Sequence, residues 1–230
     1  MGLDLDTKQL KLFGLLVEEL LVWNRRAALT SVTDLDDVQL KHLVDSLTVA
    51  PVVQEMRSER LGRLVDVGSG GGFPGIPLAI ALPWLEVVLV EATAKKASFL
   101  HHVRERLNLP NLRVLQGRAE DLAREASNRE TFDLATARAV GRVATLAELL
   151  APFLAIGGAA ILMKTHAQLV EELPSAAPAL AALGLESGRV VDVEVTGLSG
   201  RALVVLDKTG PTPAEYPRRA GVPGRRPLTR

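Results

Sequence analysis

The chain of 230 residues contains no cysteine. Disulfide bonds, thiolate metal sites and a cysteine nucleophile are therefore excluded. No apolar run reaches the roughly 18 residues that a membrane span needs. The N-terminus, MGLDLDTKQL, lacks the basic and then apolar order of a signal peptide. These absences predict a cytoplasmic protein that does not associate with a membrane.

The chain also has no net charge, because 27 lysines and arginines balance 27 acidic residues. This balance argues against a protein that binds nucleic acid through its overall charge, but it allows a local basic patch. The last 14 residues, PRRAGVPGRRPLTR, hold five arginines and no acid. On composition alone, this tail is either such a patch or a solvated, partly disordered end.

Two amphipathic helices are predicted first, over residues 7–24 and about 33–51. Leu10, Phe13, Val17 and Leu20 recur at helical spacing in the first helix, and Pro51 is expected to end the second. Strands then follow at residues 63–68, 85–92, 112–117, 132–139, 157–164, 189–198 and 201–208.

Helices are predicted between the first six of these strands, at residues 75–83, 95–109, 119–126, 143–154 and 166–184. This alternation predicts an α/β fold with a doubly wound, seven-stranded, mostly parallel sheet. The last two strands are separated only by a short turn, TGLSGR, and should pair antiparallel. We expect an N-terminal helical extension (1–60), one large domain (61–210) and a basic tail (211–230).

A glycine-rich stretch, VDVGSGGGFPGIPLAI, lies between the first strand and its helix, where doubly wound folds bind ligands. Gly68, Gly70 and Gly72 match G-x-G-x-G, and Phe73 occupies the position of the last glycine in a dinucleotide fingerprint. The side chain of Phe73 would fill space beside a cofactor that has no pyrophosphate.

Glu91 ends the second strand, 19 residues after Gly72. A carboxylate there can accept hydrogen bonds from two ribose hydroxyls, which fits any adenosine-bearing cofactor. With Phe73 in the loop, the pattern favours S-adenosylmethionine (SAM) over NAD. In the loop after the third strand, Glu120 could face an adenine ring or could stabilise the start of a helix through the macrodipole.

Several longer motifs occur in a fixed order: KHLVDSLTV, VDVGSGGGFPGIPLAI, GRAEDL, ARAVGRVATLAELLAPFL, GGAAILMK and YPRRAGVPGRRPL. From about residue 10 to residue 228 the sequence resembles the bacterial 16S ribosomal RNA guanine-N7 methyltransferases, also called glucose-inhibited division protein B. The resemblance implies a class I, Rossmann-like SAM-dependent methyltransferase. Its substrate would be guanine 527, in the 530 loop of the small ribosomal subunit RNA.

The resemblance also implies site residues. The expected cofactor contacts include the loop residues and the segments that follow the second, third and fourth strands: Gly68, Gly70, Gly72, Phe73, Glu91, Ala92, Thr93, Ala119, Glu120 and Arg138. The side chains expected to contact RNA are Lys164, Arg218, Arg219, Arg225 and Arg226. We expect a monomer whose partner is 16S rRNA within the small subunit.

The chemistry of guanine N7 agrees with what the sequence lacks. N7 is an unprotonated lone pair on the major-groove edge, so methyl transfer needs no general base and we nominate no catalytic acid or base. Without cysteine or a paired-histidine motif, no metal site is expected. His101 and His102 are expected on a solvated helix face, and His42 either pairs with Asp45 or lines the RNA approach.

Three other functions stay open at this point. A methyltransferase that acts on a small molecule or a protein would share the loop but would not need the arginine tail. A nicotinamide-dependent oxidoreductase is disfavoured by Phe73, and a module that binds SAM without transferring a methyl group would carry the same loop.

Overall fold

A computed structural model describes residues 3–56, 62–138 and 141–229. Two compact units make up the chain, residues 1–116 (the first unit) and 117–230 (the second unit). The predicted boundaries at residues 60 and 210 stay a prediction, and the first of them lies outside the described residues.

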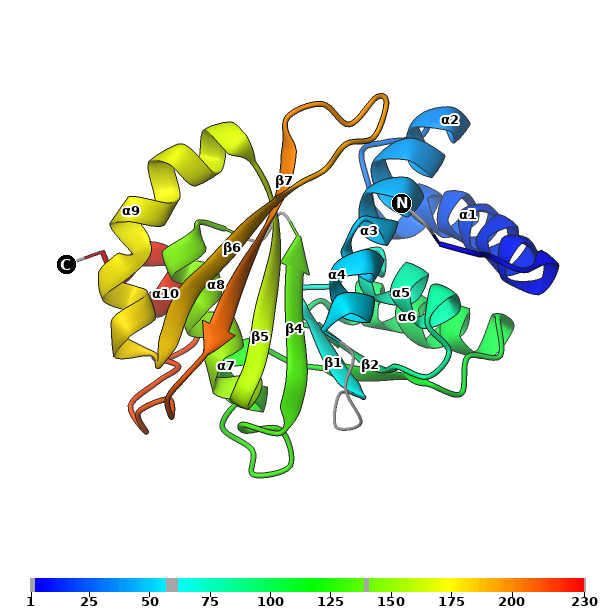
Figure 1. Ribbon diagram of the computed structural model, residues 1–230. Coiled ribbons are helices and arrows are strands. Elements are labelled where there is room, and N and C mark those ends of the chain that lie inside the picture. The colour runs from blue at the N-terminus through cyan, green and yellow to red at the C-terminus, as the bar shows by residue number, and fades with distance from the viewer. Residues whose placement is uncertain (1–2, 57–61, 139–140, 230) are drawn as a thin grey trace. The chain divides into compact units, whose positions relative to one another are not determined.

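In the first unit, three parallel strands lie in the order β3-β2-β1. Two crossover helices, α5 and α6, join them, and a set of helices precedes them (Figure 1). The strands are β1 (Arg63–Val67), β2 (Glu86–Glu91) and β3 (Leu112–Gln116). The helices are α1 (Thr7–Ala27), α2 (Leu35–Val38), the π-helix η1 (Gln39–Val44), α3 (Asp45–Leu47), α4 (Val49–Glu55), α5 (Gly75–Ala81) and α6 (Ala94–Arg106).

Helix α1 starts where a capping box satisfies its free backbone donors. Asp6 accepts a hydrogen bond from the Gln9 N–H at 2.8 Å, and the Gln9 side chain accepts one from the Asp6 N–H at 2.9 Å. The helix ends at Ala27, and the next residue, Ala28, caps it with left-handed backbone angles. Its buried face includes Leu16 and Leu20, both fully excluded from solvent.

His102 corrects one expectation, because it does not lie on a purely solvated face. Its Nε2 lies 2.8 Å from the Glu19 carboxylate, and its ring lies 5.0 Å from that of Trp23. Arg106 donates to the other Glu19 oxygen at 3.0 Å. The His102 hydrogen bond, with help from Arg106, lowers the pKa of Glu19. These contacts join α6 to α1, whereas His101 is exposed as expected.

In the second unit, four strands lie in the order β4-β5-β7-β6. Strands β4 and β5 are parallel, whereas β7 is antiparallel to both β5 and β6. Helices α8 and α9 lie together on one face of these strands (Figure 1). The strands are β4 (Phe132–Arg138), β5 (Leu154–Thr165), β6 (Leu185–Asp192) and β7 (Arg201–Lys208). The helices are α7 (Ala119–Leu122), α8 (Val143–Leu150), η2 (Ala151–Phe153), α9 (His166–Ala182) and α10 (Val222–Arg225).

The seven strands of the described residues confirm the predicted α/β, mostly parallel fold and the antiparallel last pair. Several boundaries were wrong. Pro51 lies inside α4, in the first turn, where its missing N–H has no intrahelical partner to lose. Strand β6 spans Leu185–Asp192 rather than 189–198, because residues 185–187 already pair with β7 ahead of an irregularity between Ser187 and Val190. Helix α7 ends at Leu122 rather than 126, and α8 ends at Leu150 so that β5 can start at Leu154.

The predicted fourth strand reached Ala139, which lies outside the described residues. No helix among the residues described is long and apolar enough to cross a membrane.

Candidate functional site

The glycine loop follows β1 and has a backbone that few other residues could adopt. Gly68, Gly70 and Gly72 have φ angles of 74°, 57° and 87°, in the left-handed region that favours glycine. A Cβ atom on Gly72 would lie 2.2 Å from Cδ1 of Ile76, so the first turn of α5 packs directly on the loop. A Cβ on Gly70 would meet nothing closer than the Gly68 carbonyl at 3.8 Å, so the loop surface is open there.

Asp66 supports this loop from beneath, and sequence reasoning missed it. Its side chain is fully buried in β1, and Oδ2 accepts a hydrogen bond from the Gly75 N–H at 3.0 Å. Its backbone carbonyl accepts one from the Ser69 hydroxyl at 2.9 Å. The signal was present in the sequence as a lone acidic residue inside an apolar strand, because a buried charge needs specific partners.

Glu91 joins the loop to the end of β2. One carboxylate oxygen accepts from the Gly70 N–H at 2.9 Å, and the other accepts from the Thr93 N–H at 2.7 Å. The residue is only 6% exposed, whereas Ala92 and Thr93 are exposed. Each carboxylate oxygen can accept more than one hydrogen bond, so the group can hold the loop and still bind a hydroxyl.

The N-terminal helices contribute to the surroundings of the loop through His42. Its ring stacks on buried Phe73, with centroids 4.8 Å apart and planes inclined by 21°. His42 Nε2 lies 2.7 Å from the Thr30 hydroxyl. His42 belongs to the π-helix η1, and π-helical turns occur frequently at functional sites. No periodicity in the sequence could have shown this turn.

In the second unit, Ala119 and Glu120 begin α7 and are both buried. A Glu120 oxygen accepts a hydrogen bond from the Gly221 N–H at 2.8 Å, which brings residues 101 positions apart into contact. Arg138 is the last residue of β4 and is half-buried. Their roles at a cofactor stay predictions.

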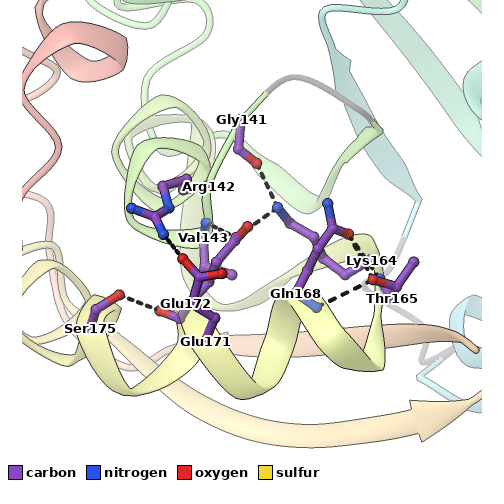
Figure 2. A network of polar contacts seen from close by, with 9 residues as sticks. All are labelled: Gly141, Arg142, Val143, Lys164, Thr165, Gln168, Glu171, Glu172 and Ser175. Carbon is purple, nitrogen blue, oxygen red and sulfur yellow. Dashed lines mark hydrogen bonds and ion pairs between the residues drawn. The ribbon is translucent and has the colours of Figure 1, made fainter.

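Lys164, expected to contact RNA, lies instead inside a polar network between β5, α8 and α9 (Figure 2). The side chain is 5% exposed, and its ammonium donates to the Glu172 carboxylate at 2.8 Å and to the Gly141 carbonyl at 2.6 Å. Glu172 also accepts from the Val143 N–H at 2.8 Å, at the start of α8. This pairing argues against a direct phosphate contact by Lys164.

The C-terminal segment, residues 211–229, packs on the rest of the second unit. The Arg218 side chain donates to the fully buried carboxylate of Glu148, from Nε at 2.8 and 3.1 Å and from Nη2 at 2.6 Å. Those bonds raise the pKa of the Arg218 guanidinium above its usual range. By contrast, Arg219, Arg225 and Arg226 are exposed.

The structure therefore brings the predicted cofactor residues of the first unit together, but it does not leave all the predicted RNA contacts free to bind RNA. In the first unit it brings the glycines, Phe73, Glu91 and Thr93 to the carboxyl ends of β1 and β2, where α/β folds bind ligands. In the second unit it pairs two of the five predicted RNA contacts internally. Among the described residues, no group of three or more His, Asp or Glu side chains could hold a metal ion.

Known proteins with similar folds include a mutant of MtNAS in complex with S-adenosylmethionine. That structure has a TM-score of 0.59 at 15% identity, covering 88% of this chain and 76% of that one. A SAM-dependent methyltransferase from Aquifex aeolicus has a TM-score of 0.54 at 16% identity, covering 74% of this chain and 92% of that one. These matches agree with the predicted class I, Rossmann-like methyltransferase fold.

Sequence relatives are much closer. The ribosomal RNA small subunit methyltransferase G of Dehalococcoides mccartyi is 43% identical over 229 residues, which is 99% of this chain and 95% of that protein. The family described as GidB, rRNA small subunit methyltransferase G, matches residues 9–196. With that identity over nearly its whole length, the chain belongs to the rRNA small subunit methyltransferase G family.

Proposed function

We propose that this protein transfers a methyl group from SAM to N7 of guanine 527 in the 16S rRNA of the small ribosomal subunit. The observation that supports this substrate is the 43% identity with an rRNA small subunit methyltransferase over 99% of the chain, which includes the arginine-rich segment. A ribosomal substrate places the reaction in the cytoplasm, and we propose that the enzyme acts as a monomer.

The residues of the glycine loop fit SAM. The surface above Gly70 is open, and a side chain on any other residue would fill it. Glycine therefore leaves room for a ligand close to the backbone. Glu91 lies at the end of the neighbouring strand, with its carboxylate already fixed by two backbone N–H groups. A carboxylate fixed in this way is preorganised to accept hydrogen bonds from ribose hydroxyls.

When bound, SAM supplies an electrophilic methyl group on a sulfonium. The chain's own residues need only orient the guanine and exclude water, because N7 already carries its lone pair. We assign cofactor contacts to Gly68, Gly70, Gly72, Phe73, Glu91, Ala92 and Thr93 in the first unit, and to Ala119, Glu120 and Arg138 in the second. No side chain is assigned a proton to move.

We assign the RNA phosphates to the three exposed arginines of the C-terminal segment, Arg219, Arg225 and Arg226. Guanidinium groups bind phosphate oxygens in a bidentate manner, and these three are exposed. Lys164 and Arg218 could reach a phosphate only if buried carboxylates lost their partners, which is strongly unfavourable.

The test is transfer of label. The full chain is incubated with tritiated SAM and small subunits whose 16S rRNA lacks the modification, and the labelled RNA is mapped by protection of defined fragments. We expect label in the fragment that contains the 530 loop. Label in a protein or a small molecule instead would support one of the other methyltransferase functions.

A further inference from the structure

The C-terminal segment, residues 211–229, is held by side chains that lie far from it in sequence. Arg124 and Arg129, in the loop after α7, donate to backbone carbonyls of the segment. The accepting residues are Ala214, Glu215 and Pro217 for Arg124, and Thr212, Pro213 and Tyr216 for Arg129. We call these contacts, together with the Glu148–Arg218 pair, the clasp.

The Glu148–Arg218 pair is the buried centre of the clasp. Glu148 lies in α8 with no exposed surface, and the Arg218 backbone N–H donates to it at 2.8 Å in addition to the guanidinium. A buried carboxylate without a partner is costly, so removal of the Arg218 side chain should release the attached segment. A guanidinium held in this way has its charge compensated already.

Beyond Arg218, the segment makes two contacts that bear on the reaction. The Gly221 N–H donates to Glu120, which we have assigned to the cofactor. Arg218 Nη2 also donates to the Arg226 carbonyl at 2.7 Å, which fixes the turn that carries Arg225 and Arg226. One anchored arginine thus sets the positions of a cofactor residue and of two exposed arginines.

We infer that Arg218 and Glu148 are a positioning pair, which holds the C-terminal segment so that Gly221 fixes Glu120 and the exposed arginines face RNA. Arg218 does not itself bind phosphate. The roles of Glu120 and of the exposed arginines rest on the proposed function, whereas the clasp does not.

The test compares three variants of the full chain, Glu148→Gln, Arg218→Ala and Arg124→Ala, with Arg219→Ala as the matched control. Arg124→Ala opens the clasp from the surface and leaves no buried charge, so it remains informative if a Glu148 or Arg218 variant fails to fold. Amide hydrogen exchange over residues 212–226 reports the order of the segment, calorimetry reports SAM affinity, and titration with small subunits reports RNA binding.

We expect faster exchange in the segment and SAM binding weakened about tenfold in all three variants, comparable to the loss of one charge-assisted hydrogen bond. Arg219→Ala should leave both quantities at the wild-type value and weaken only RNA binding. Exchange is measured on the free protein, so a failure of the rRNA methylation assay leaves this result readable.

Two outcomes would overturn the inference. If Arg218→Ala weakens RNA binding while Glu148→Gln and Arg124→Ala behave as wild type in all measurements, Arg218 is a phosphate contact. If exchange in the segment rises but SAM affinity stays unchanged, the clasp does not position Glu120.

Discussion

The glycine loop of the first unit and the polar networks of the second unit are built from different parts of the chain. The loop is a backbone structure, with positive φ angles and N–H groups bound by Glu91 and Asp66, all within residues 66–93. The networks are side-chain pairs, and Glu148 and Arg218 lie 70 residues apart. A substitution should therefore damage the loop through local geometry and the networks through an unpaired buried charge.

The largest effect is expected at the loop, from Gly72→Val. A branched side chain would resist the positive φ, a backbone strain of about 1–3 kcal/mol. It would also collide with Ile76, which adds to that cost. We expect no measurable SAM binding by calorimetry. Gly14→Val is the control, because a Cβ on Gly14 has nothing within 4 Å. Wild-type SAM affinity in a folded Gly72→Val protein would refute the site.

The next prediction concerns stability rather than cofactor binding, and Lys164→Met tests the side-chain networks. It leaves Glu172 buried without its cation, so we expect the free energy of unfolding to fall by about 3–5 kcal/mol. Denaturant unfolding measures the change. The double variant Lys164→Met/Glu172→Gln removes the charge but keeps an acceptor for the Val143 N–H, and should recover part of the loss. A single variant as stable as wild type would show that the pair contributes little.

Glu91→Gln should have a smaller, more specific effect. Its amide group can accept from only one of the two N–H donors now bound, and the charge that favours ribose hydroxyls is lost. We expect SAM binding weakened by about 1–3 kcal/mol, measured by titration calorimetry. Glu86→Gln, at the other end of β2, is the control. Equal affinities in the two variants would remove Glu91 from the cofactor site.

The smallest effect per residue is expected from the exposed arginines. Arg219→Ala/Arg225→Ala should reduce the slope of log K against log salt for binding to the small subunit by roughly 0.7–0.9 per residue, with SAM affinity unchanged. Lys8→Ala/Lys11→Ala removes the same charge from exposed positions on α1 and should leave the slope as it is. An equal reduction in both double variants would mean that overall charge, not this segment, governs RNA binding.

The sequence predicted the fold and the loop because both depend on local information. Strand and helix periodicities are local, and the glycines mark positions where the backbone leaves the usual region. The partners of Lys164 and Arg218 could not be predicted, because they are set by tertiary contacts. Nothing in the sequence around Arg218 indicates that it pairs with the buried Glu148. The π-helix at His42 and the docking of the C-terminal segment likewise depend on tertiary contacts.

The proposed function is tested most directly by identifying the atom that receives the methyl group. 16S rRNA from the labelled small subunits is treated with borohydride and aniline, which cleave the chain at 7-methylguanine, and the ends are located by primer extension. We predict one new cleavage, at guanine 527, that appears with the wild-type protein and is absent with Gly72→Val. Labelled RNA without that cleavage, or cleavage at another guanine, would contradict the assignment.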